Sequence, residues 1–320
     1  MNAFKRKLAV KNLFSYPIVL VYLTALFYIP NEIFRDRGNY VLFAYDSGYF
    51  FQYEKTDIAY YANEPLFLYI ADLFNTIPEM FPTFMGMFIA FIYCAYTIKF
   101  SKNTLLFIMG FILLISNTFL IYPQIMVLRQ GLATALFLVV FFSVDNIKLR
   151  LVLSLLIPFI HVVFIFIIPL YFIFYFILSK KSKFIVFLYT AIFTLTISIV
   201  FFIVASALGL RQAEQYEGVA QASLGGGSFV VHTIVLIYLY FLGNTENNDL
   251  YKWSLIGLTF YVFSYFLIPS AGRFFISFYP FILYSLISRA RLRDFLLIGL
   301  LCLMFGILFF NGGLNGMLAE

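Results

Sequence analysis

Long apolar runs alternate along the chain with short segments that hold most of the charged residues. One helical crossing of a bilayer needs about 20 mostly apolar residues. On this basis we place spans at 14–30, 79–98, 104–122, 125–144, 184–206, 229–243, 251–268, 272–288 and 294–311. The pattern predicts an all-α, polytopic transmembrane bundle of about 9 to 11 spans, with residues 1–320 forming a single integral-membrane domain.

The segment 151–178 does not fit one upright span. At a rise of ~1.5 Å per residue it would extend about 42 Å, which is longer than one crossing and shorter than two. A single crossing would also separate two basic clusters from the basic N-terminus, although lysine and arginine favour the cytoplasmic side. These clusters are Lys180, Lys181 and Lys183, and Arg289, Arg291 and Arg293. We therefore expect a broken or re-entrant hairpin, turning near Pro158 because proline removes a helical hydrogen bond.

This topology places the N-terminus in the cytoplasm and defines the outer segments. The longest is the loop 31–78, in which Glu64 and Pro65 open an apolar sequence at helical spacing, EPLFLYIADLF. That spacing predicts an amphipathic helix at the membrane interface. A tight turn is expected at 119–125. The polar segment 207–228 is expected to be a mobile outer loop that could act as a lid.

Composition excludes a soluble fold. Apolar residues make up 63% of the chain, charged residues 11%, and the mean hydropathy is +0.96, whereas soluble domains are about half apolar and a quarter charged. The net charge of +6 comes from short clusters between apolar runs, so it indicates cytoplasmic loops and not a nucleic-acid partner. Cys94 and Cys302 lie in apolar segments and suggest neither a disulfide nor a metal site.

Arg129 lies near the start of an apolar helix, where a charge costs a few kcal/mol or more and needs protein or water around it. Its planar guanidinium is suited to bidentate binding of a phosphate or a carboxylate, and Gln124 and Gln130 could add neutral donors. The competing interpretations are an arginine extending to the interface or a structural ion pair.

His161 is expected at the same depth as Arg129, where a neutral imidazole could accept a proton from a sugar hydroxyl; hydrogen bonding between helices is the alternative. Arg273 is expected at the outer end of a helix. It could bind a second phosphate oxygen or serve as an interfacial anchor. Arg211 is more easily explained as an anchor. His232 is assigned to packing. The sequence contains no motif for ATP, a nicotinamide cofactor or a metal.

Several of these residues also carry a resemblance to the EpsG/Wzy group of bacterial polysaccharide polymerases. The similarity extends over about 40 to 290, and its parts are short: Arg129-Gln130-Gly131-Leu132-Ala133, then His161, Tyr45-Asp46 with Tyr49, Glu64-Pro65-Leu66, and Arg273-Phe274. The order of these parts and their shared outer location make the resemblance.

The resemblance implies a GT-C-like membrane glycosyltransferase of the bacterial inner membrane. Such polymerases move a growing glycan from undecaprenyl diphosphate to the terminal hydroxyl of a lipid-linked repeat unit at the periplasmic face. The implied partners are the lipid-linked donor and acceptor, membrane lipid and a chain-length-determinant protein; no metal, nucleotide or nucleic acid is expected.

The same resemblance suggests roles for individual residues. Arg129 and Arg273 would stabilise the diphosphate leaving group, and His161 would be the base, with Asp46 or Glu64 as the alternative. Tyr49 would pack on a sugar face; Gln124, Gln130 and Arg211 would assist binding. Three other classes stay open: an O-antigen ligase with the same charges, a transporter or flippase of lipid-linked sugars, and a membrane acyltransferase.

Overall fold

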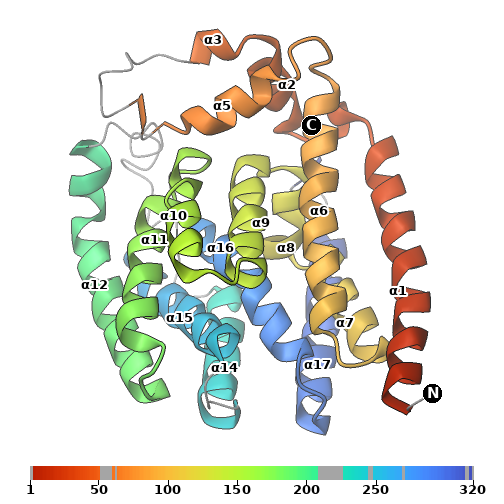
Figure 1. Ribbon diagram of the computed structural model, residues 1–320, viewed down its shortest axis with the longest axis vertical. Coiled ribbons are helices and arrows are strands. Elements are labelled where there is room, and N and C mark those ends of the chain that lie inside the picture. The colour runs from red at the N-terminus through yellow and green to blue at the C-terminus, as the bar shows by residue number, and fades with distance from the viewer. Residues whose placement is uncertain are drawn as a thin grey trace. The chain divides into compact units, whose positions relative to one another are not determined.

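The computed structural model describes residues 3–50, 60–61, 63–207, 226–243, 248–268, 271–313 and 317–318. Within these ranges the fold is all-α, as predicted, and the single pairing of extended residues is an isolated antiparallel bridge between Phe34 and Leu318. Figure 1 shows the helices and their labels. The side chains of 3–10, 49–50 and 200–207 lie outside the described part.

Each predicted apolar run contains a helix, although α1 starts well before the predicted residue 14 and the run 104–122 is divided between two helices; the number of membrane spans stays a prediction. The helices are α1 (Ala3–Tyr28), α6 (Met80–Phe100), α7 (Thr104–Ser116), α9 (Leu128–Ser143), α12 (Lys183–Ala207), α14 (Gly227–Leu242), α15 (Asp249–Ser264), α16 (Ala271–Ile287) and α17 (Leu292–Leu308). In the described residues, the segments Met80–Phe100 and Leu292–Gly312 are long and apolar enough to cross a membrane. Several of the others are shorter apolar helices.

The chain divides into two compact units, which we describe separately. The first contains 1–50, 68–143 and 283–320; the second contains 51–67 and 144–282. Within the first, α1 packs on α6 and α7, and α7 packs on α17. Within the second, α15 packs on both α12 and α14. The single-domain organisation stays a prediction.

The predicted span 104–122 is interrupted at Asn117. Here α7 ends and a second helix, α8 (Thr118–Ile125), starts at an angle of 64° to it. The Asn117 side chain accepts a hydrogen bond from the Phe119 backbone N–H at 2.9 Å, and this capping favours a new helix start. The predicted turn at 119–125 is therefore wrong, because those residues are helical and the chain turns after Ile125.

Two glycines allow the backbone of α8 to lie against its neighbours. A Cβ atom at Gly86 of α6 would lie 2.5 Å from the Gln124 carbonyl oxygen, and one at Gly131 of α9 would lie 2.1 Å from the Pro123 carbonyl oxygen. Any larger residue would force the helices apart. Gly131, in the Arg129-Gln130-Gly131 sequence, is therefore required for the close packing of α9 on α8.

The predicted break in 151–178 is confirmed. The helix α10 (Ile147–Ser154) stops, residues 155–163 form turns and a short 3-10 helix that contains Pro158, and α11 (Phe164–Ile173) follows. The guanidinium of Arg150, near the start of α10, lies beside the hydroxyl of Tyr171, near the end of α11. Because the first arm begins where the second arm finishes, the chain turns back on itself in this segment.

The long polar segment 31–78 contains more helix than expected. It holds α2 (Arg37–Tyr45), α3 (Ser47–Phe50) and α5 (Pro65–Asp72). The amphipathic helix predicted after Glu64 is α5: Phe67, Leu68 and Ala71 are buried while Tyr69 and Asp72 are exposed, which is the spacing of one helical face. The helix α2 was not predicted.

Lysine side chains hold the C-terminal ends of neighbouring helices. Lys11 donates hydrogen bonds to the Ile98 and Ser101 carbonyls at the end of α6, at 2.7 and 3.0 Å. In the second unit, Lys183 donates to the Tyr240 carbonyl at 2.7 Å and Lys252 donates to that of Ser179. Cations are favoured at these ends because the last carbonyls of a helix are unsatisfied and partly negative.

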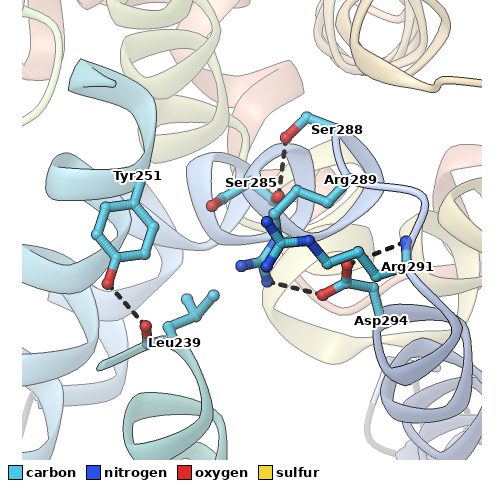
Figure 2. Close-up of polar contacts among 7 residues, drawn as sticks. All are labelled: Leu239, Tyr251, Ser285, Ser288, Arg289, Arg291 and Asp294. Carbon is cyan, nitrogen blue, oxygen red and sulfur yellow. Dashed lines mark hydrogen bonds and ion pairs between the residues drawn. The ribbon is translucent and has the colours of Figure 1, made fainter. Parts of the chain in front are cut away.

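An ion pair between a half-buried arginine and a buried aspartate lies where α16 connects to α17. Figure 2 shows the Arg289 guanidinium facing the Asp294 carboxylate, with Nη2 3.0 Å from Oδ1. The second carboxylate oxygen of Asp294 accepts a hydrogen bond from the Arg291 backbone N–H at 3.3 Å, which caps the start of α17. The pair fixes the sharp connection between two apolar helices.

Candidate functional site

The most distinctive polar contact in the second unit joins Glu64 to His161. The Oε1 atom of Glu64 lies 2.5 Å from Nδ1 of His161, and it also accepts the Val162 backbone N–H at 3.1 Å. Each residue exposes only 3% of its surface. An acid and a histidine that are buried together and bonded to each other satisfy the requirement that buried charges have partners.

Local structure places both side chains. Glu64 immediately precedes α5, whose first residue is Pro65, a residue suited to that position because its missing N–H would be unsatisfied there. The backbone of Glu64 has φ of 65°, in the left-handed region, which costs a non-glycine residue roughly 1–3 kcal/mol and is concentrated at functional sites. His161 lies in the non-helical break between α10 and α11, where its ring is not aligned with a helix face.

The other ring nitrogen of His161 is in a different situation. Its Nε2 atom is buried and has no hydrogen-bond partner among the described residues. When Nδ1 carries the proton and donates it to the Glu64 carboxylate, Nε2 has a free lone pair. A carboxylate that fixes the tautomer of a histidine and stabilises its protonated form is the arrangement that makes imidazole an effective base.

Arg129 lies in the first unit and contacts α2. It is the second residue of α9 and is half-buried. Its guanidinium carbon is 5.4 Å from the centre of the Phe43 ring, a cation–π distance, and it hydrogen-bonds to Tyr40. Burial raises the pKa of the Tyr40 hydroxyl, whereas the charge of Arg129 lowers it. Arg129 is therefore held against an aromatic helix face.

Arg273 lies in the second unit, as the third residue of α16, and is exposed. The next residue, Phe274, is buried and contacts Phe166 of α11 with ring centres 5.6 Å apart. The helix that carries Arg273 therefore packs on the helix that follows His161. Because Arg129 belongs to the other unit, the predicted convergence of Arg129, His161 and Arg273 stays a prediction.

The two glutamines are both buried in the first unit. Gln124 uses its amide there: Nε2 donates to the Leu120 carbonyl at 2.7 Å, and Oε1 accepts from Tyr22 at 2.9 Å. Gln130 is fully buried. Gln124 therefore contributes to helix packing.

The remaining candidates occupy other settings. Asp46 is exposed and follows α2. Tyr49 belongs to α3, but its side chain lies outside the described part. Arg211 and nearly all of the predicted loop 207–228 also lie outside the described residues.

Two features of the structure were not predicted. Glu64 and His161 were separate candidates for one role, and nothing in their sequence separation shows that they touch. Arg37 was not selected at all, although it is the first residue of α2 and is completely buried. His232 does pack as predicted: it is buried, its Nδ1 lies 2.6 Å from the Ser228 carbonyl, and the Phe275 ring is 4.7 Å away.

Comparison with known proteins finds no match: no family model, no curated protein and no solved structure is similar to the chain. In the described residues, histidine, cysteine, aspartate and glutamate do not form a group of three that could hold a metal. The chemistry of the site is therefore argued from its own geometry.

Proposed function

We propose that this chain is a multi-pass membrane glycosyltransferase that extends a surface polysaccharide. It would transfer a growing glycan from undecaprenyl diphosphate to the terminal hydroxyl of a lipid-linked repeat unit. The observation that supports this most is the buried contact of Glu64 with His161, which leaves Nε2 for a substrate hydroxyl. The substrate class comes from the resemblance to the EpsG/Wzy group.

The proposed setting is the bacterial inner membrane, with the N-terminus in the cytoplasm and a GT-C-like bundle of about 9 to 11 spans. The hydrogen bonds of Lys183 and Lys252 to helix ends support a common basic side within the second unit. The turn at 155–163 would then face the periplasm. A non-helical backbone at membrane depth requires a protein or aqueous surrounding, and the burial of His161 agrees with this.

The proposed reaction balances without a metal or a nucleotide. Nε2 of His161 takes the proton of the acceptor hydroxyl as the hydroxyl oxygen bonds to the anomeric carbon. The bond from that carbon to the diphosphate oxygen breaks, and undecaprenyl diphosphate leaves with the electron pair. Arg129 and Arg273 would stabilise the charge on the leaving group, Glu64 would stabilise the imidazolium, and the proton would pass to water.

One observation also favours a transporter as a second candidate. A buried acid–histidine pair in an apolar protein is suited to proton relay, which pumps and transporters use. The two classes differ in what drives them. A glycosyltransferase turns over in detergent without a membrane gradient, whereas a transporter has no product to release there.

The test uses the purified protein with a lipid-linked donor and acceptor, measuring release of undecaprenyl diphosphate. Wild-type protein should release it in detergent, and His161→Ala should lower the rate by roughly a hundredfold or more if His161 is the base. His232→Gln is the matched control, because it changes the other buried histidine of the same unit. Near-normal turnover by His161→Ala would remove His161 from the mechanism.

The transporter alternative is tested with the same protein reconstituted in vesicles. Movement of a lipid-linked sugar between leaflets, without any release in detergent, would replace the glycosyltransferase by a transporter. A ligase is distinguished in cells: loss of a polymerase leaves single repeat units on the lipid core, whereas loss of a ligase leaves none.

A further inference from the structure

Arg37 is a buried cation with an incomplete set of partners. It is fully buried, its Nε donates to the Ile125 carbonyl at 3.1 Å, and its Nη1 donates to Asn31 Oδ1 at 3.2 Å. Its Nη2 atom is buried and has no hydrogen-bond partner among the described residues. Both acceptors are neutral groups, and the Phe34 ring, whose centre lies 5.1 Å from the guanidinium carbon, supplies only a partial negative charge.

The charge of Arg37 persists at neutral pH. Burial lowers the pKa of this arginine to about 10, which still leaves it protonated under physiological conditions. A buried charge without an opposite charge costs several kcal/mol, and the carbonyl at the end of α8 supplies only a partial negative charge. The environment therefore favours an anion beside Nη2.

A single residue, Tyr22, lies between Arg37 and an apolar groove. The Tyr22 hydroxyl lies within electrostatic reach of Arg37 and donates to Gln124 Oε1 at 2.9 Å. The ring of the same residue lines the groove, which has a volume of about 430 Å³ and is formed by α1 and α7. Its other lining residues are Pro17, Ile18, Val21, Ala25 and Phe111.

The dimensions of the groove indicate the kind of occupant. All of its lining side chains are hydrocarbon except the Tyr22 hydroxyl, which is directed to Gln124, so only an apolar chain would be favoured there. From Ala25 to Pro17 the groove follows α1 for roughly 12 Å, close to the ~15 Å of hydrocarbon in one leaflet. Its volume is at the lower end of the ~300–1,000 Å³ range of small-ligand pockets, which fits one acyl chain and not a long polyprenyl chain.

We propose that Arg37 and the α1–α7 groove form a binding site for one anionic phospholipid of the bilayer. An acyl chain lies in the groove, and the headgroup phosphate accepts a hydrogen bond from Nη2 when Tyr22 turns away from Gln124. A single available nitrogen matches one phosphate oxygen better than a diphosphate. The inference rests on the proposed membrane location, but it does not depend on glycosyl transfer.

The test is native mass spectrometry of the purified full chain, titrated with phosphatidylglycerol, phosphatidylcholine or undecaprenyl diphosphate. Wild-type protein should retain one phosphatidylglycerol and discriminate against phosphatidylcholine. Arg37→Gln should weaken the binding of phosphatidylglycerol at least tenfold. Ala25→Trp should weaken it by as much, because the exposed tryptophan side chain would fill the groove. The controls are Arg35→Gln, an exposed arginine nearby, and Leu20→Trp, an exposed residue of α1 that does not line the groove.

Three results would overturn the proposal: equal phosphatidylglycerol affinity in Arg37→Gln and wild type, equal affinity in Ala25→Trp and Leu20→Trp, or a preference for undecaprenyl diphosphate at this site. Should Arg37→Gln fail to fold, the comparison of the two tryptophan variants still decides. His161→Ala should keep its phosphatidylglycerol. Loss of turnover therefore tests the proposed function, and loss of lipid tests this site.

Discussion

The carboxylate of Glu64 and the imidazole of His161 are in contact at 2.5 Å although 97 positions separate them in the chain. Glu64 immediately precedes α5, and His161 lies in the turn between α10 and α11. The contact therefore joins the start of the amphipathic helix to the returning hairpin. Both ends of this contact depend on non-helical backbone.

Replacing Glu64 by Gln should separate two effects of Glu64: the hydrogen bonding that orients the His161 segment and the negative charge of the carboxylate. The amide can still accept the Val162 N–H, but it cannot stabilise an imidazolium as a carboxylate does. On the proposed mechanism we expect turnover to fall by roughly a hundredfold, with little change in the Michaelis constant of the acceptor. The rate at which undecaprenyl diphosphate is released measures the turnover. Glu32→Gln, an exposed acid of the same polar segment, is the control, and an equal loss in that variant would argue against the pair.

Replacing Gly131 by Ala should destabilise the protein. The new Cβ would lie 2.1 Å from the Pro123 carbonyl oxygen and 2.9 Å from Ile89 Cδ1, and overpacking of this kind costs about 1–3 kcal/mol. Thermal unfolding in detergent should show a lower midpoint. Gly299→Ala is the matched control, because its Cβ would meet only Met109 Cε, at an ordinary 3.5 Å. A midpoint unchanged by Gly131→Ala would mean that α8 and α9 separate easily.

The Arg289–Asp294 pair should behave as a coupled unit. Asp294→Leu alone leaves the half-buried Arg289 without its opposite charge, and removing one member of a fully buried pair costs about 3–5 kcal/mol, so a loss below that figure is expected here. Replacing both, as Arg289→Met with Asp294→Leu, should recover most of that loss, since well-packed apolar side chains can substitute for a buried pair. Unfolding midpoints of the single and double variants measure the coupling. Additive losses would show that the two residues act separately.

The topology can be tested by labelling single cysteines. In a chain with Cys94 and Cys302 replaced by alanine, Lys181→Cys should react with a membrane-impermeant maleimide only after the cells are opened, because the proposal places this exposed residue in the cytoplasm. Ala220→Cys, in the predicted outer loop, should react in intact cells. Labelling of Lys181→Cys in intact cells would reject the proposed membrane topology.

The helices and the break were predictable because apolar length and charge distribution act locally. Runs of about 20 apolar residues need helical hydrogen bonding in a membrane, and Pro158 marks a place where that bonding fails. Asn117 was overlooked as a helix break because it is one polar residue in an apolar run, and only its side-chain contact with the Phe119 N–H shows the new start.

The site was only partly predictable. Glu64 and His161 were chosen for their chemistry, but their contact depends on tertiary packing. Arg37 was overlooked because it lies in a polar segment, RDRGNY, that suggests a solvated loop. Its burial follows from the inner face of α2, where Tyr40 and Phe43 recur at helical spacing, a pattern too short to outweigh the neighbouring charges.

The lysines that cap helix ends have an evolutionary consequence. On the proposed topology, a substitution at Lys11, Lys183 or Lys252 would remove an orientation signal and would also leave a carbonyl of a different helix without its hydrogen bond. A mutation at one of these positions would therefore have two harmful effects: it would disturb the orientation of the helices during membrane insertion, and it would destabilise the folded protein. A mutation at Lys181, which is exposed, would have only the first effect, and this position should vary more freely among descendants of this gene.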